Sequence, residues 1–213
     1  MASRPAATKD RPSGREGGEA SLRASAARVP RTLYAAPSAR YAVKVKAVAQ
    51  LLNDLQSSGL VQGYALFGAM AQMRYTEAVA TLDADVRVAV AQADRLDVLG
   101  DIYAFCAARG HSPEGEAIRV GAWPVQFVPI FSPLTREAME QAETANFDGV
   151  PLRVVRAAHL AVIALSVGRA KDFARVLALL ESGSVTRQEI GLLATRHGLD
   201  EAWERFEARF PRE

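Results

Sequence analysis

The chain has 213 residues, of which 49% are hydrophobic and 23% are charged, a composition typical of a globular protein with one or two domains. No uninterrupted apolar run reaches the roughly 18 residues that a membrane helix needs, so we expect no membrane-spanning segment. The net charge of +2 conceals an asymmetry, because residues 1–32 carry seven basic and three acidic side chains and the remainder carries 19 basic and 21 acidic ones. This balance gives little support to a protein that binds nucleic acid over a broad basic face.

Residues 1–38 are expected to form a disordered basic tail. They are rich in Ala, Arg, Ser, Pro and Gly and contain almost no large apolar side chain before Val29, so ordering them would not bury enough surface to offset the lost entropy. The tail lacks the apolar segment of a secretory signal, and its acidic residues Asp10, Glu16 and Glu19 are unlike an organelle transit peptide. We therefore expect a cytoplasmic protein whose tail is solvated or makes a weak contact with RNA or another acidic partner.

The folded part is predicted to begin at residue 39 with a helix whose apolar face ends at Ser57-Ser58-Gly59; that face consists of Val45, Val48, Leu52 and Leu55. A short apolar strand, Tyr64 to Phe67, then runs directly into Gly68-Ala69-Met70-Ala71. This pattern predicts a strand that turns tightly into a helix. The free backbone N–H groups at such a helix start, those of Gly68 and Ala69, could bind a phosphate group.

Two carboxylates follow in a β-favouring run that ends at Val88. Asp83 and Asp85 are two residues apart, so the alternation of a strand places both on the same face. Neighbouring carboxylates repel unless a cation lies between them, and Mg²⁺ usually takes one or two carboxylates together with substrate phosphates. The pair therefore predicts a site for Mg²⁺ or Mn²⁺ with a nucleotide, in which Thr81 would support the strand by a hydroxyl hydrogen bond and Arg87 could reach phosphates.

The next elements are a helix and a hairpin. The helix is predicted to start at Asp94, and the lone Cys106 on its apolar stripe is expected to be a buried, inert thiol. The three histidines stand far apart, without zinc-binding spacing. Residues 117–130 are predicted to form a β-hairpin that places Gln126 beside Asp83 and Asp85. Trp123, at the tip of this hairpin, would cover the sheet edge or stack on a base.

The remainder is predicted to be mainly helical. Ser132-Pro133 starts a helix that looks polar enough to be peripheral, and Val150 to Val155 form a short strand. A helix ending at Gly168, another beginning near Ala170 and a third with a capping box at Thr186 follow. A last helix carries Trp203, Phe206 and Phe210. We thus expect a core over residues 39–155 and a helical C-terminal portion over residues 156–213.

Three of these features together resemble a known family. Gly68-Ala69 followed by Thr81-x-Asp83-x-Asp85 is similar to the signature of the DNA polymerase β-like nucleotidyltransferase superfamily in its minimal form. Arg169-x-Lys171-Asp172 is similar to a later motif of the abortive-infection (AbiEii) toxin nucleotidyltransferases, the branch that the chain resembles most. The resemblance covers about residues 64–180. It has two departures, since Gln126 stands where the family has a third carboxylate and Ala164 where it usually has a lysine.

The resemblance implies an α/β (α+β) nucleotidyltransferase core, in which a mixed sheet is flanked by helices, followed by a helical portion. It implies transfer of a nucleoside monophosphate from a nucleoside triphosphate to an acceptor hydroxyl, with a transfer RNA, a protein or a small molecule as the open acceptor and a cognate antitoxin as a partner. Asp83 and Asp85 would hold the metal and act in catalysis with Gln126 and Lys171. Nucleotide binding would fall to Gly68, Ala69, Thr81, Arg169 and Lys171, whereas Asp172 would hold its motif in place.

Two other functions remain open from the sequence. Gln126 and Ala164 favour a catalytically degenerate module that binds nucleotide or regulates a partner, because fold does not imply function. The retained Asp83, Asp85 and Arg169-x-Lys171-Asp172 motif favour the enzyme. A nucleic-acid-binding protein that works through its basic tail is the third reading.

Overall fold

The computed structural model describes residues 39–77, 81, 83–90 and 97–211, with side chains from residue 45 onward. The predicted disordered tail over residues 1–38 and the predicted helix start at Asp94 lie outside the described residues. Within the described residues, no helix is both long and apolar enough to span a membrane.

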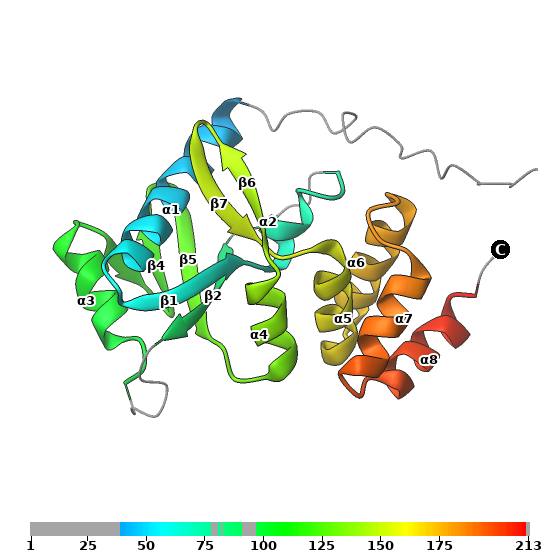
Figure 1. Cartoon of the computed structure of the whole chain (residues 1–213). Coiled ribbons are helices and arrows are strands. Elements are labelled where there is room, and N and C mark those ends of the chain that lie inside the picture. Colours follow the sequence, from blue (N-terminus) through cyan, green and yellow to red (C-terminus); the bar gives the residue numbers. More distant parts are fainter. Residues whose placement is uncertain (1–38, 78–80, 82, 91–96, 212–213) are drawn as a thin grey trace, which may run out of the picture. The chain divides into compact units, whose positions relative to one another are not determined.

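Helices and strands are interspersed as far as Val154, and the elements from Ala157 onward are all helices (Figure 1). The strands are β1 (Val61–Leu66), β2 (Ala84–Val90), β3 (Ser112–Glu114), β4 (Ala117–Val120), β5 (Trp123–Pro129), β6 (Glu143–Phe147) and β7 (Val150–Val154). The helices are α1 (Ala39–Ser57), α2 (Gly68–Gln72), α3 (Gly100–Ala108), α4 (Pro133–Glu140), α5 (Ala157–Val167), α6 (Ala170–Glu181), α7 (Arg187–Arg196) and α8 (Asp200–Arg209).

The strands form one mixed sheet in the order β3-β4-β5-β2-β1-β7-β6. At its centre β1 runs antiparallel to β2 and parallel to β7, and β2 runs parallel to β5. The predicted fold class, a mixed sheet flanked by helices and followed by a helical C-terminal portion, is confirmed. Because β1, β2 and β5 are neighbours, the glycine turn, the Asp83 strand and the Gln126 strand meet in the middle of the sheet.

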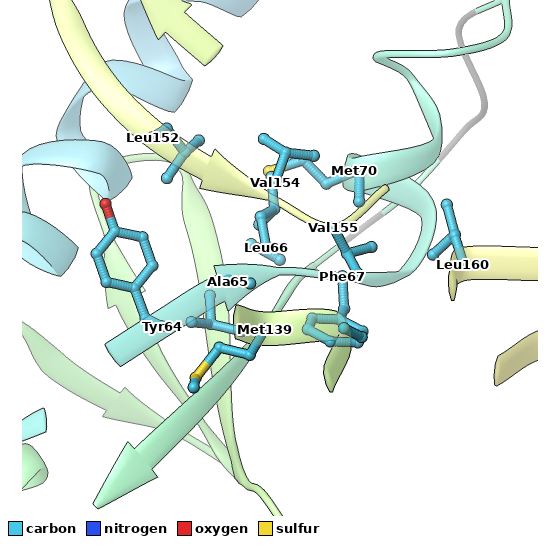
Figure 2. Close-up of a cluster of buried hydrophobic side chains, with 14 of the residues drawn as sticks. Tyr64, Ala65, Leu66, Phe67, Met70, Met139, Leu152, Val154, Val155 and Leu160 are labelled. Carbon is cyan, nitrogen blue, oxygen red and sulfur yellow. The ribbon is translucent and has the colours of Figure 1, made fainter. Parts of the chain in front are cut away.

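One face of the sheet is buried under α1, which contacts β1, β5, β6 and β7. The amphipathic pattern predicted for this helix is confirmed, because Val48, Leu52 and Leu55 are fully buried. Figure 2 shows side chains of β1 and β7 meeting on the sheet, with Leu66 next to Val154, its register partner. The hydroxyl of Tyr64 donates to Oδ1 of Asn53 at 2.7 Å, which ties the end of this apolar layer to α1.

The opposite face of the sheet is only partly covered, by α4. A Cβ on Gly63 would lie 3.3 Å from Sδ of Met139, so α4 packs close against β1, as Figure 2 illustrates. By strand alternation Asp85 and Arg87 of β2 and Gln126 of β5 lie on one face of the sheet, and all three are half-buried. The sheet therefore has one apolar face and one face that carries polar side chains at its centre.

The prediction that the helix after Ser132 is peripheral is wrong. Its residues Leu134, Ala138 and Met139 are buried, and Glu137 accepts a hydrogen bond from Nη1 of Arg196 at 2.7 Å. Glu137 faces α7, whereas Arg136 and Glu140, which also suggested a solvated helix, are exposed. Glu137 also meets Nε2 of His197 at 2.7 Å and that of His159 at 3.5 Å, although no three His, Cys, Asp or Glu side chains of the described residues are arranged to hold a metal.

The C-terminal portion consists of helices α5 to α8, and the boundaries predicted at Gly168, near Ala170 and at Thr186 are confirmed. Gly168 ends α5 in the left-handed conformation at φ +71°, and Thr186 caps α7 with the predicted capping box. An aromatic cluster joins α6 to α8, in which the rings of Phe173 and Phe206 have centroids 6.1 Å apart. Ser184 Oγ donates to the carbonyl of Tyr75 at 2.9 Å, which connects this helical portion to the segment after α2.

Strands β3 and β6 were not predicted. Both are edge strands that pair with one neighbour only; Ser-Pro-Glu has no large apolar side chain, and in Glu-Thr-Ala-Asn-Phe only Ala145 and Phe147 alternate with polar residues. The expectation for the single thiol holds, since Cys106 is fully buried and burial raises its pKa to about 11. Trp123 is also buried at the start of β5, so it covers the sheet rather than offering a free ring to a base.

Candidate functional site

The centre of the candidate site is the contact between the glycine turn and Asp85. The backbone N–H of Phe67 donates to the carbonyl of Asp85 at 2.8 Å, which sets the end of β1 against the start of β2. Gly68 follows with φ +65°, and a Cβ at this position would overlap Oδ2 of Asp85. Glycine is therefore required at position 68 for two reasons. Residues with a side chain rarely adopt this φ, and a Cβ would occupy the place of the Asp85 carboxylate.

The amides predicted to bind phosphate lie at the start of α2. The first intrahelical hydrogen bond runs from the N–H of Ala71 to the carbonyl of Phe67 at 3.2 Å, so the N–H groups of Gly68 and Ala69 precede the helical ladder. Phe67 caps the helix without a side-chain hydrogen bond. The amides at this turn thus lie beside the Asp85 carboxylate, where a ligand that bridges a cation would meet them.

Thr81 and Asp83 lie just before β2, which starts at Ala84, so Asp83 precedes the strand on which the sequence placed it. The Thr81 hydroxyl lies 3.1 Å from the carbonyl oxygen of Asp83 and 3.2 Å from its Oδ1, so it donates to both in a shared bond. This is the supporting hydrogen bond expected of Thr81. It holds the exposed carboxylate of Asp83 against its own backbone.

The carboxylate of Asp85 is partly buried and lies near both a negative charge and positive charges. Burial is the largest cause that raises its pKa, and the neighbouring carboxylate of Asp83 raises it further. The positive charges of Arg87, Arg175 and Lys171 oppose that rise, but the pKa stays above its ordinary value. The two carboxylates therefore repel each other and are flanked by three cations, an arrangement that a bound cation and a bound polyanion would both relieve.

Gln126 lies directly opposite Asp85 in the parallel register of β2 and β5, so the two side chains share one face. Its Nε2 donates to Oε2 of Glu116, in the turn before β4, at 3.4 Å. Among the described residues no third His, Cys, Asp or Glu joins Asp83 and Asp85 in a metal-binding group. The strand position that faces Asp85 thus offers a neutral amide.

The Arg169-x-Lys171-Asp172 motif divides into different roles. Asp172 is buried, with 1% of its side chain exposed, and accepts hydrogen bonds from the backbone N–H of Arg169 at 3.2 Å and from its Nε at 2.7 Å. Although burial alone would raise the pKa of Asp172, these bonds lower it. Asp172 therefore has the structural role expected of it, and Arg169 is its partner with 59% of its side chain exposed, whereas the charge of Lys171 reaches Asp85.

Arg175 is the site residue that sequence reasoning missed. Its Nε donates to Oε1 of Gln72 at 3.1 Å, and its Nη1 lies 3.6 Å from Oδ1 of Asp172. The available signal was its position on α6, four residues after Lys171 and therefore on the same helical face. Ala164 is buried in α5 with 1% exposure, so that position faces the helical core and carries no charge.

Gly68→Ala is expected to weaken metal binding as well as stability. The positive φ should cost about 1–2 kcal/mol, and rotating Asp85 off its rotamer about 0.5–1.5 kcal/mol, which corresponds to roughly two- to tenfold weaker Mn²⁺ binding. Gly198→Ala is the matched control, since Gly198 also has φ +65° but has nothing within 4 Å of a Cβ. Thermal melts should show that both variants are destabilised, Gly68→Ala more than Gly198→Ala, and Mn²⁺ titrations should show a loss of Mn²⁺ affinity only for Gly68→Ala. Equal Mn²⁺ affinity in both variants would contradict the assignment.

No model of a known protein family matches the sequence, and no curated protein matches it. Among solved structures, the chain is similar to an antigenic nucleotidyltransferase-like protein from Paracoccidioides brasiliensis, with 15% identity, a TM-score of 0.49 and coverage of 76% of this chain and 93% of that one. It is similar to the antibiotic-resistance factor ANT(2'')-Ia, with 12% identity, a TM-score of 0.47 and coverage of 78% and 98%. It is similar to the Megavirus polyadenylate synthase, with 14% identity, a TM-score of 0.42 and coverage of 67% of this chain and 32% of that one. At these identities and scores the likeness concerns the fold alone.

Proposed function

We propose that the chain is a metal-dependent nucleotidyltransferase, which moves a nucleoside monophosphate from a nucleoside triphosphate to an acceptor hydroxyl. The observation that carries the proposal is the position of the Asp85 carboxylate, which lies against Gly68 where a side chain would otherwise be. The charges of Asp83 and of three cations act on it. A carboxylate pair next to free helix-start amides suits a ligand that is both cationic and anionic. A metal-bound triphosphate has that character.

The residues present fit one divalent cation. Two carboxylates that repel each other form a hard oxygen donor pair, and the absence of a side chain at Gly68 leaves room for the Asp85 carboxylate. Asp83 and Asp85 would hold Mg²⁺ or Mn²⁺, which when bound neutralises phosphate charge and polarises the reacting phosphorus. The neutral Gln126 makes the site weaker for a second cation than for the first.

The remaining residues act on the nucleotide itself. The amides of Gly68 and Ala69 donate to phosphate oxygens, Lys171 offsets the charge that develops on the phosphates, and Arg169 lies at the rim beside Asp172. In the transfer the acceptor oxygen forms a bond to the α phosphorus while the bond from that phosphorus to pyrophosphate breaks. Pyrophosphate leaves with the electron pair, and the hydroxyl proton passes to solvent. Positioning and charge neutralisation supply most of the rate in such an in-line displacement.

The proposal is tested by incubating the protein with each α-labelled nucleoside triphosphate, Mg²⁺ or Mn²⁺, and a mixture of cell RNA and protein. Label in an acceptor is expected, and it identifies the acceptor class and the preferred base together. Nucleotide binding without label in any acceptor would instead establish the second candidate function, a binding or regulatory module. The observation in favour of that alternative is the neutral Gln126 opposite Asp85.

The motifs support a narrower form of the proposal, an AbiEii-type toxin that is neutralised by a cognate antitoxin protein. Its support is the sequence resemblance of Gly68-Ala69, Asp83-x-Asp85 and Arg169-x-Lys171-Asp172. Induced expression of the chain in a bacterial host should then arrest growth, and the Asp85→Asn variant should not. Normal growth with the unaltered chain expressed at the same level would count against the toxin role.

The pH dependence of metal binding follows from Asp85. A metal ligand must be deprotonated, so Mn²⁺ affinity should fall as the pH drops through the raised pKa of Asp85, at a higher pH than for an ordinary aspartate. Arg87→Gln removes a cation that lowers this pKa and should move the loss to higher pH still. The exposed Arg205→Gln is the control. Mn²⁺ titrations over a pH series measure the midpoints, and identical midpoints in the three proteins would contradict the link.

The effect of pH on folding stability is opposite to that of an aspartate in an ion pair, whose contribution to stability increases as the pH rises. The folded pKa of Asp85 lies above its unfolded value, so the metal-free protein binds more protons when folded. Its stability should therefore fall as the pH rises from the ordinary aspartate pKa through the raised one. The site costs stability in order to keep a carboxylate ready for a cation.

A further inference from the structure

We propose that Arg175 is a substrate-binding residue, which contacts the terminal phosphates of the nucleoside triphosphate. This inference rests on the proposed function and adds to it a residue outside the motifs. Its observations are the contacts that hold the guanidinium between α6 and α2.

The position of the guanidinium is set by two neighbours. Nε of Arg175 donates to Oε1 of Gln72 at 3.1 Å, and Nη1 lies 3.6 Å from Oδ1 of Asp172. Gln72 is itself buried, with 5% exposure, and only 18% of the Arg175 side chain is exposed. Arg175 is therefore held in one place, unlike a surface arginine that samples many conformations.

That place is next to the glycine turn. Gln72 is four residues after Gly68 in α2, so the two residues lie on the same side of this short helix, one turn apart. Gly68 lies under the Asp85 carboxylate, and the positive charge of Arg175 acts on that carboxylate. The guanidinium is thus held against α2, one turn from the glycine, and its charge acts on Asp85.

The remaining hydrogen-bonding capacity of Arg175 suits a phosphate. Within the described part of the chain its contacts engage Nε and Nη1, and a guanidinium carries five N–H donors in a planar fork. Asp172 is shared with Arg169, which takes the shorter bonds, so Arg175 is the less completely neutralised of the two cations. A partly buried guanidinium with donors left over matches the bidentate geometry of phosphate oxygens.

Asp83 and Asp85 would hold a metal ion beside the α phosphate. Arg175 contacts Gln72, which lies one turn along α2 from Gly68, so its guanidinium would meet phosphates beyond the reacting one. It should therefore distinguish triphosphates from monophosphates.

The test is titration of the full chain with Mn²⁺ and either a non-hydrolysable nucleoside triphosphate or the matching nucleoside monophosphate. Arg175→Ala is expected to weaken triphosphate binding about tenfold or more and to leave monophosphate binding within twofold, as loss of a charge-assisted bidentate contact predicts. Arg74→Ala is the matched control, because Arg74 lies just after α2, is 24% exposed and pairs with Glu143 at 3.1 Å. That variant should leave both affinities unchanged.

Arg175→Lys keeps the test valid if the alanine variant does not fold. A lysine retains the charge but cannot contact Gln72, Asp172 and a phosphate from one plane, so triphosphate binding should weaken several-fold and monophosphate binding should not. Equal losses of affinity for the triphosphate and the monophosphate would show that Arg175 has only a structural role. No loss of affinity for either would show that Arg175 does not contact the nucleotide. A parent protein that binds no nucleotide would overturn the proposed function itself, and this inference with it.

Discussion

Replacing Asp83 and Asp85 together by Asn is expected to abolish the rise in melting temperature that Mn²⁺ and a nucleoside triphosphate cause in the parent protein. A ligand that binds only the folded state at about 100 times its Kd stabilises that state by about 2.7 kcal/mol. For a chain of this size, that corresponds to an increase in Tm of roughly 5–11 °C. The double variant loses both anionic oxygen donors of the site and should show almost none of this increase.

The same variant should lose transfer activity by about a hundredfold or more, since positioned charge is the main catalytic contribution in phosphoryl transfer. Its metal-free form should melt no lower than the parent at neutral pH, because the substitution removes the repulsion between two carboxylates of which one is partly buried. Glu201→Gln is the control, because its carboxylate is 91% exposed and pairs with Arg205. A double variant that still binds Mn²⁺ and nucleotide like the parent would show that the site lies elsewhere.

Gln126→Asp is expected to tighten Mn²⁺ binding and to raise the transfer rate. Gln126 faces Asp85 across β2 and β5, and an aspartate there would add a charged oxygen donor for a second cation. Two unit charges about 4 Å apart interact by roughly 4 kcal/mol at an effective dielectric of about 20, an upper figure from which desolvation must be subtracted. The parent should therefore hold one metal well and a second one poorly, and should transfer slowly.

Gln126→Asn separates charge from shape in that experiment, because asparagine has the size of aspartate without its charge. Mn²⁺ titrations with a non-hydrolysable triphosphate should show an added metal for Gln126→Asp alone, and labelling assays should show a faster rate for the same variant. Gln126→Asp should also destabilise the metal-free protein, since its carboxylate would lie near Asp85 and Glu116. If the Asp and Asn variants behave alike, the strand position opposite Asp85 takes no part in metal binding.

The elements that the sequence predicted well are those whose cause is local. The end of α1 at the Ser57-Ser58-Gly59 run, the left-handed Gly168 and the capping box at Thr186 depend on a few neighbouring residues. Local causes leave a local pattern, so these boundaries could be predicted from the residues alone. The short edge strands β3 and β6 leave a weaker pattern, because they contain few apolar residues, although each pairs with the strand that follows it in the chain.

The candidate site shows the same division. The Asp83-x-Asp85 spacing and the glycine at position 68 are local features, and by themselves they indicate a phosphate and metal site. Which cation lies next to that site depends on contacts between residues that are far apart in the sequence. Arg169 belongs to the recognisable motif but pairs with Asp172, whereas Arg175 belongs to no motif and is held by Gln72, 103 residues away.

The sequence by itself determined that a strand turns at Gly68, that Asp85 lies on the next strand with Asp83 close by and that helices complete the chain, because backbone preference and side-chain period act over a few residues. Only the tertiary structure decided that the Asp85 carboxylate lies on the Cα of Gly68 and that Gln126 stands opposite it. Register and packing between β1, β2 and β5 set these contacts. Such pairings join distant segments through burial of a shared apolar face, and many registers satisfy the same pattern until that face is packed.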